Sequence, residues 1–180
     1  YEPLRLTSYS GFENTPSFSP DGSQIAFSWD GPEGDNADIY VKLVGLGERI
    51  QLTDNPVPDF FPAWSPDGRH IAFLRTEPTG TSIWLIPALG GTERKLVAIV
   101  PFAISPGFFV VVSPNLSLDL TPDGNWLVAT LLRTEPLALH LISAQTGETR
   151  QLTNPKEGLA ADFFPSVSPD GRTLAFLRQG

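Results

Sequence analysis

The sequence predicts an all-β fold, a β-propeller of four-stranded antiparallel blades that forms a partial ring of about three and a half to four blades. The main observation is a motif, Ser/Thr-Pro-Asp-Gly, that occurs four times, with its prolines at positions 20, 66, 122 and 169. The copies are therefore 46, 56 and 47 residues apart, and a period of about 40 to 50 residues is typical of propeller blades. Short β-branched and aromatic stretches separated by glycine lie between the copies, as several strands per repeat require.

Each motif is predicted to form the tight turn between the first and second strands of a blade. Proline presets φ at about −65°, aspartate suits the second corner, and glycine takes the left-handed conformation that closes the hairpin. First strands run into the turn at 59–65 and 162–168, and second strands follow it at 24–29, 70–75, 126–133 and 173–178. The small alanine of Ile-Ala-Phe suits a strand that is packed between neighbouring sheets.

The other two strands of each blade follow a loop of variable length. Third strands are expected at 38–44, 82–87 and 137–143, and fourth strands at 48–53, 93–97 and 149–153. The chain then divides into an outer strand of a preceding blade (1–7), blades at 12–53, 59–97 and 113–153, an insertion at 98–112, and the first half of a blade at 162–180.

The two ends of the chain do not coincide with blade boundaries. Residues 3–7 match a fourth strand with no blade before it, and the last copy ends after its second strand. A second strand without a neighbour leaves an exposed sheet edge, which folded proteins avoid. We therefore expect a fragment of a larger ring, or else self-association through the open blade edges.

The residue just before each turn is predicted to pack between blades. This position holds Phe18, Trp64, Leu120 and Val167. In the third copy it follows Asp119, where the other copies have a small residue, so the Asp119 carboxylate would need a hydrogen-bond partner.

The composition excludes several kinds of site and partner. The chain has 180 residues, no cysteine and a net charge of −8. Without cysteine there is no disulfide, thiolate metal site or cysteine nucleophile, and without a basic patch direct contact with nucleic acid is not expected. The uncharged run 96–114 is long enough to span a membrane, but its three prolines and one glycine argue against a membrane helix.

These residues resemble the TolB-like, WD-related propeller repeat. That unit reads Leu-Thr, about ten residues, Pro-x-Trp-Ser-Pro-Asp-Gly-x-x-Ile-Ala-Phe, and later Ile-Tyr-Val and a Gly-Gly turn; residues 52–91 match it nearly throughout. The third copy departs most from the pattern, and the Gly-His and Trp-Asp signatures of true WD repeats are absent.

The resemblance implies a scaffold. TolB-like propellers bind proteins in the bacterial periplasm, similar blades precede the catalytic domain of prolyl oligopeptidases and the tricorn protease, and similar arrays look like the C-terminal portions of bacterial regulators behind a kinase or winged-helix domain. We therefore expect a non-catalytic protein-interaction or sensory propeller module of a larger bacterial signalling or regulatory protein. The alternatives are the accessory propeller of a prolyl-oligopeptidase-like serine peptidase and a periplasmic TolB-like envelope protein. The compartment stays open, with the periplasm or another extracytoplasmic location favoured over the cytoplasm.

No catalytic set is found in the sequence. A Gly-x-Ser-x-Gly elbow is absent. His70 follows a turn and is expected at the surface, whereas His140 aligns with Tyr40 and Trp84 and is expected to fill an aromatic packing position. We expect that any catalytic domain lies outside this chain and that no cofactor is bound.

The acidic loop 30–38 is the best candidate for a metal site. Its possible ligands are Asp30, Glu33, Asp35 and Asp38, and such hard oxygen ligands would select Ca²⁺. The spacing does not match an EF-hand loop, and a solvated acidic turn between two strands is the simpler interpretation.

One candidate partner-binding surface is formed by polar residues that begin the first strands. These residues are Glu13, Asp59, Asn115 and Asp162. If the first strands line the propeller axis, these side chains ring one mouth of the central channel. The alternative is that each side chain bonds to backbone amides within its own blade.

A second candidate surface lies in the insertion 98–112. Phe102, Phe108 and Phe109, with the valines that follow, would form an apolar patch for docking or self-association if they were exposed. An exposed Phe-Phe-Val-Val-Val strand would also promote aggregation. The alternative is therefore a connection that buries these side chains against blade edges.

Overall fold

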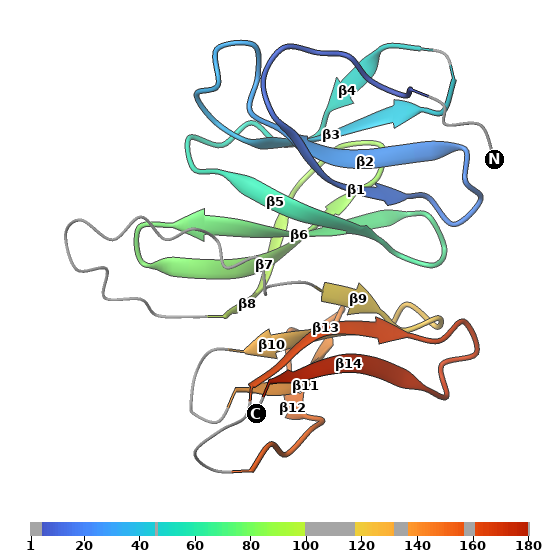
Figure 1. Ribbon diagram of the computed structural model, residues 1–180, viewed down its shortest axis with the longest axis vertical. Coiled ribbons are helices and arrows are strands. Elements are labelled where there is room, and N and C mark those ends of the chain that lie inside the picture. Colours follow the sequence, from blue (N-terminus) through green and yellow to red (C-terminus); the bar gives the residue numbers. More distant parts are fainter. Residues whose placement is uncertain (1–4, 46, 100–117, 132–136, 157–160, 180) are drawn as a thin grey trace.

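The computed structural model describes residues 5–45, 47–99, 118–131, 137–156 and 161–179. Within these ranges it contains fourteen strands, no helix, and therefore no helix that could cross a membrane. The strands form three four-stranded sheets and one two-stranded sheet, which follow one another from the N-terminal to the C-terminal part of the molecule (Figure 1). The predicted all-β propeller of antiparallel blades is confirmed.

Each sheet follows chain order, so that every strand pairs antiparallel with the next. The first blade consists of β1 (Glu13–Phe18), β2 (Gln24–Trp29), β3 (Asp38–Leu43) and β4 (Arg49–Gln51). The second consists of β5 (Asp59–Trp64), β6 (His70–Glu77), β7 (Gly80–Pro87) and β8 (Arg94–Ala98). The third consists of β9 (Leu118–Leu120), β10 (Trp126–Leu131), β11 (Ala138–Ser143) and β12 (Thr149–Gln151), and the last sheet of β13 (Ala161–Val167) and β14 (Leu174–Gln179).

The Ser/Thr-Pro-Asp-Gly turn is built from bonds between its own residues. In the second blade, the Ser65 hydroxyl donates to Asp67 Oδ1 over 2.6 Å, and the same oxygen accepts from the Arg69 amide. The Ser65 Oγ in turn accepts from the His70 amide, and Gly68 has a φ of 69°. Equivalent bonds recur in the other three copies. Local chemistry alone therefore shapes these hairpins.

All four turns lie at one end of the molecule, on the right in Figure 1. A Cβ atom placed on Gly68 would lie 3.8 Å from Cδ of Pro20 in the preceding turn. The same relation holds for the next two pairs, with distances of 3.9 Å and 3.4 Å to the preceding proline. From the second turn onward, each turn therefore lies against the one before it.

The first strands of neighbouring blades lie next to one another and share an irregularity. Thr15, Phe61 and Phe164 have positive φ angles of 49°, 55° and 53°, and each stands just before a proline at a shift in strand register. A non-glycine residue in this conformation costs roughly 1–3 kcal/mol. The Phe61 amide donates to Thr15 Oγ1 over 3.2 Å, so at this pair the bulge also connects one blade to the next.

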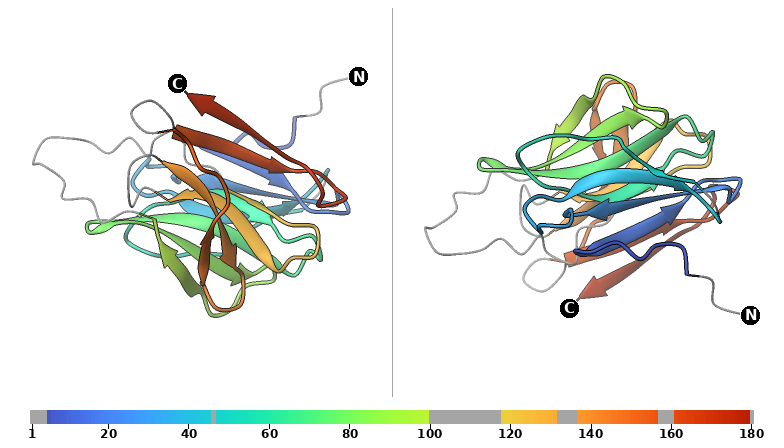
Figure 2. Two further views of the ribbon diagram at one scale, coloured as in Figure 1. Left: turned by 90° about the horizontal axis from the view of Figure 1, so that it is seen from below. Right: turned by 90° about the horizontal axis from the view of Figure 1, so that it is seen from above.

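The core lies between successive blades, whose strands are turned relative to one another (Figure 2). Ile39 and Val41 of the first blade pack with Ile71 and Phe73 of the second, and all four are at most 3% exposed. Trp64 belongs to the same cluster, and its indole donates to the Ser17 carbonyl over 3.1 Å. A second cluster joins the second and third blades.

Two predictions about the first blade are wrong. Phe18, at the position equivalent to Trp64, is 57% exposed, because no described sheet packs against its outer side. In the predicted outer strand 1–7, the described residues 5–7 are not in a strand. Leu6 instead packs against the cluster that contains Ile25 and Phe27. Phe18 would fill an interface between blades, and it is exposed because the described array ends at the first blade.

Asp119 has the hydrogen-bond partners that its position required. Its Oδ2 accepts from the Val167 amide of β13 over 2.7 Å, and its Oδ1 accepts from the Leu120 amide. The carboxylate therefore connects the third blade to the last sheet. We predict that Asp119→Ala lowers the free energy of unfolding by about 1–3 kcal/mol, because the Val167 amide loses its acceptor. Urea unfolding followed by tryptophan fluorescence measures this loss, and an unchanged midpoint would argue against the bridge.

Several predictions fall outside the described residues. These are the apolar patch of Phe102, Phe108 and Phe109, the polar residue Asn115, and most of the insertion 98–112. The described start of that insertion consists of Ala98, the last residue of β8, and buried Ile99.

Candidate functional site

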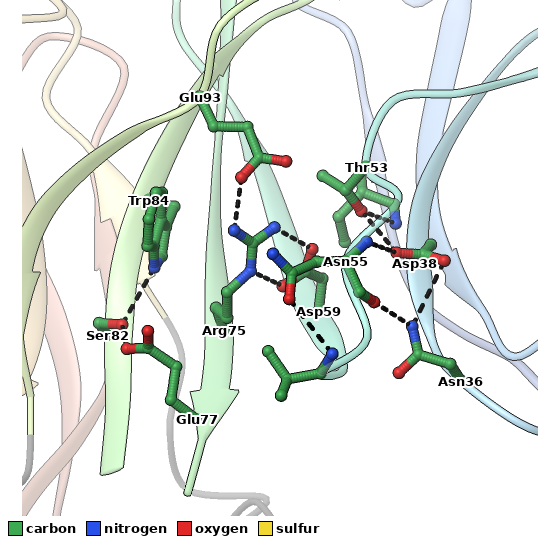
Figure 3. A network of polar contacts seen from close by, with 12 residues as sticks. Asn36, Asp38, Thr53, Asn55, Asp59, Arg75, Glu77, Ser82, Trp84 and Glu93 are labelled. Carbon is green, nitrogen blue, oxygen red and sulfur yellow. Dashed lines mark hydrogen bonds and ion pairs between the residues drawn. The ribbon is translucent and has the colours of Figure 1, made fainter. Parts of the chain in front are cut away.

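A network of polar side chains lies where β5 begins, between the first and second blades (Figure 3). At its centre, Asp59 of β5 stands directly across from Arg75 of β6. The Arg75 Nε and Nη2 atoms donate to the two Asp59 oxygens over 2.7 Å each, and Nη1 donates to Glu93. The guanidinium carbon also lies 4.6 Å from the centre of the Trp84 ring. Both side chains of the central pair are almost fully buried, with 3% of Arg75 and none of Asp59 exposed.

The last sheet contains an equivalent ion pair whose arginine is more exposed to solvent. Arg178 of β14 donates to both oxygens of Asp162 of β13 over 2.7 and 2.8 Å. Its side chain is 45% exposed, because the sheet consists of only two strands. The two pairs therefore have the same geometry and differ in burial.

The two aspartates differ in pKa although their bonds are alike. Burial raises the pKa of Asp59 to about 6, against the opposing effect of the hydrogen bonds from Arg75. For Asp162 the hydrogen bonds from Arg178 outweigh burial, and they hold its pKa below the ordinary value of aspartate. The surrounding blades, and not the pair itself, thus set the direction of the shift.

These two directions predict opposite pH dependences. An unfolded aspartate has a pKa of about 4; because the folded-state pKa of Asp59 is higher, its contribution to stability falls as the pH rises from about 4 to about 6. Asp162, whose pKa is lowered, stabilises the fold at neutral pH and loses this contribution as the pH falls through its folded-state pKa. Carboxyl ¹³C titrations should give a midpoint of about 6 for Asp59 and a midpoint below that of an unfolded aspartate for Asp162. The reverse order would contradict this account.

Asp38 forms the second half of the network. Its Oδ1 accepts from the Thr53 hydroxyl and the Asn55 amide, and its Oδ2 from the side-chain amides of Asn36 and Gln51, over 3.1 to 3.4 Å. All four donors are neutral. Burial raises the pKa of Asp38 above its ordinary value, since these bonds only partly offset the loss of water.

Of the predicted channel-mouth residues, Glu13 and Asp59 begin β1 and β5, Asp162 is the second residue of β13, and Asn115 lies outside the described residues. The carboxylates of Asp59 and Asp162 bond to arginines of their own blades, which fits the alternative of bonding within a blade, with arginine in place of backbone amides. Glu13 is half-buried, and its Oε2 accepts from the Thr7 hydroxyl. A partner-binding role for this set stays a prediction.

The four carboxylates of the acidic loop have separate surroundings and bonding partners. Asp30 accepts from the Phe12 amide, Asp35 from the Asn36 amide, and Asp38 belongs to the buried network, while Glu33 is exposed. Among the residues that the structure describes, no three His, Asp or Glu side chains are arranged to hold a metal ion. The Ca²⁺ site stays a prediction, which calorimetric titration with CaCl₂ would test.

Both histidines are half-buried, so His70 is less exposed than predicted. The strand β6 begins at His70, whose backbone amide is bonded to the turn. His140 Nδ1 lies 3.0 Å from the Ala138 carbonyl oxygen.

Sequence reasoning missed a cleft of about 580 Å³ beside this network, on the first blade. Arg49 lines it, together with Trp29, Tyr40 and the loop that contains Asp35. The Arg49 guanidinium lies over the rings of Tyr9 and Trp29, with its carbon 4.3 and 4.2 Å from the ring centres. In the sequence, Trp29 stands where the second blade and the last sheet have Arg75 and Arg178, but this single difference does not indicate a cleft.

Comparison with solved structures finds similar folds in other proteins. A protein assigned as TolB from Agrobacterium tumefaciens superposes with a TM-score of 0.76 at 23% identity, over 94% of this chain and 57% of that one. The chain has the TolB-like β-propeller fold. A prolyl endopeptidase structure also matches this TolB-like array, with a TM-score of 0.67 at 16% identity, over 95% of this chain and 26% of that one.

Among curated sequences, the uncharacterized peptidase YuxL of Bacillus subtilis (strain 168) is 30% identical over 161 residues. The match covers 89% of the TolB-like chain and 21% of YuxL, so the chain spans about a fifth of that relative's length. No protein-family model matches the chain.

Proposed function

We propose that this chain is a non-catalytic protein-interaction module of a larger bacterial signalling or regulatory protein. The proposal rests on one observation, which is that the hydroxyls and buried carboxylates described below are already bonded within the blades. The hydroxyls of Ser19, Ser65, Thr121 and Ser168, which by type could be nucleophiles, each donate to an aspartate within a turn. The buried carboxylates are bonded in the blades, so the described residues suit binding at a surface better than chemistry.

The second candidate is the accessory propeller of a prolyl-oligopeptidase-like serine peptidase. The likeness to YuxL and to a prolyl endopeptidase favours it. In that role the array would control access to a catalytic domain elsewhere in the protein.

Site-specific photo-crosslinking in cells that express the full-length protein tests both candidates. A photoreactive residue replaces Arg69, whose side chain is 80% exposed at the end with the turns, or Ile50, which is 59% exposed on β4. An interaction module gives a discrete adduct with another protein at one position and not at the other. An adduct with a peptidase domain of the same polypeptide would favour the accessory propeller, and the absence of adducts at both positions would contradict an interaction role for these surfaces.

A further inference from the structure

The cleft on the first blade has walls from four consecutive parts of the chain. Trp29 ends β2, Asp35 lies in the loop before β3, Arg49 begins β4, and Asp54 follows β4. Asp38 and Tyr40 of β3 form its floor, both at most 8% exposed. At about 580 Å³ the cleft is in the size range of sites that hold small ligands or peptide side chains.

The charges of this cleft favour a cationic group. Three carboxylates, from Asp35, Asp38 and Asp54, line it against the single guanidinium of Arg49. The Asp38 side chain is buried and bonds only to neutral donors, so in the described residues its charge has no cationic partner. A ligand ammonium or guanidinium would supply the missing charge.

Arg49 requires something different of the ligand. Its guanidinium lies over two aromatic rings, yet within the described part of the chain it forms no hydrogen bond or ion pair. A guanidinium has five N–H donors in a fixed planar arrangement. The ligand should therefore also carry hydrogen-bond acceptors for Arg49. A phosphate would be repelled by the three carboxylates of the cleft. Uncharged carbonyl oxygens accept hydrogen bonds without this repulsion.

The second blade shows what fills the equivalent positions when the blade provides both charges itself. Strand register places Arg75 where the first blade has Trp29, and Trp84 where it has Tyr40. There the Arg75 guanidinium covers the Trp84 ring and is bonded to Asp59 and Glu93. The first blade has no such internal pair at these positions.

We infer that the cleft binds an extended peptide segment of a partner protein through a lysine or arginine side chain. The side-chain cation lies between Asp35 and Asp54, next to Asp38, and Arg49 donates to carbonyl oxygens of the peptide backbone. This inference rests on the proposed interaction function and names the chemistry of one partner site.

Titration of ¹⁵N-labelled protein with acetyl-Ala-Lys-Ala-amide, against acetyl-Ala-Gln-Ala-amide, tests the inference. The lysine peptide should shift the indole N–H signal of Trp29, which is fixed by its bond to the Ser10 carbonyl, and the side-chain amide signals of Asn36, Gln51 and Asn55. It should bind several-fold more tightly than the glutamine peptide. Equal affinities, or shifts confined to other blades, would overturn the inference.

Two variants and a control separate the two contacts. Asp54→Asn, at an exposed position, should weaken binding of the lysine peptide by about two- to five-fold and leave the glutamine peptide unaffected. Arg49→Gln should weaken both peptides alike. Glu148→Gln removes an exposed carboxylate of the third blade and should change neither affinity.

An equal loss of lysine-peptide affinity in Asp54→Asn and Glu148→Gln would show attraction by net charge alone and overturn the site. A photo-crosslinked partner without lysine-peptide binding in the cleft would remove this site and leave the interaction module standing.

Discussion

Arg75→Met is expected to lower the free energy of unfolding by about 3–5 kcal/mol, because it leaves the buried Asp59 carboxylate without its cation. Methionine keeps much of the buried side-chain volume, so the loss reports the charge and not a cavity. Urea unfolding at pH 7 measures it. The deficit should shrink at pH 5, since protonation of Asp59 removes the unpaired charge.

The last sheet provides the matched control. Arg178→Met removes the same two hydrogen bonds from Asp162 but at a position where the arginine side chain is 45% exposed. Its effect should be much smaller, because the half-exposed Arg178 forms an ion pair that water already screens. A double variant, Asp59→Leu with Arg75→Met, should be more stable than Arg75→Met alone. Equal losses for the two arginines would contradict the role assigned to burial.

Gly147→Ala is the second substitution with a large expected effect, about 2–4 kcal/mol. Gly147 lies in the turn between β11 and β12 with a φ of 74°, and a Cβ atom there would be 2.2 Å from the backbone oxygen of Leu96 in β8. Backbone cannot rotate away as a side chain can, so the second and third blades must separate locally. Thermal or urea unfolding detects the loss.

Gly22→Ala is its control. Gly22 has nearly the same φ, 70°, but no atom lies within 4 Å of an added Cβ. This substitution should cost only the backbone strain, about 1–2 kcal/mol. The difference between the two variants therefore measures the close approach of the blades, and similar costs would argue against it.

Turns and strands could be predicted from the sequence because their causes are local. The hydroxyl, aspartate and glycine of each turn bond within a few residues, so the motif alone specifies the hairpin. Apart from the outer strand expected at 1–7, the predicted strand limits agree with the observed ones to about two residues where the structure describes them. Phe18 was predicted incorrectly for the opposite reason, since its burial depends on a neighbouring sheet and not on its own repeat.

The ion pairs and the cleft were harder to predict because they combine residues from several strands. Asp59 and Arg75 are separated by the same interval as Asp162 and Arg178, a repeated spacing that could have revealed the pair. The Arg49 site had no such signal, because it occurs in one blade and depends on how Tyr9, before β1, folds back over that blade.

The two-stranded last sheet has a consequence for how the molecule opens. Ala175, Phe176 and Leu177 of β14 are exposed, whereas the equivalent residues of β6 are fully enclosed. In arrays whose units contact only their neighbours, the units at the ends come apart before those in the middle. Amide hydrogens of β14 should therefore exchange with solvent through frequent local opening, while those of β6 should wait for the unfolding of the whole array. We therefore expect stability to be graded along the described array, with its most durable part in the second blade.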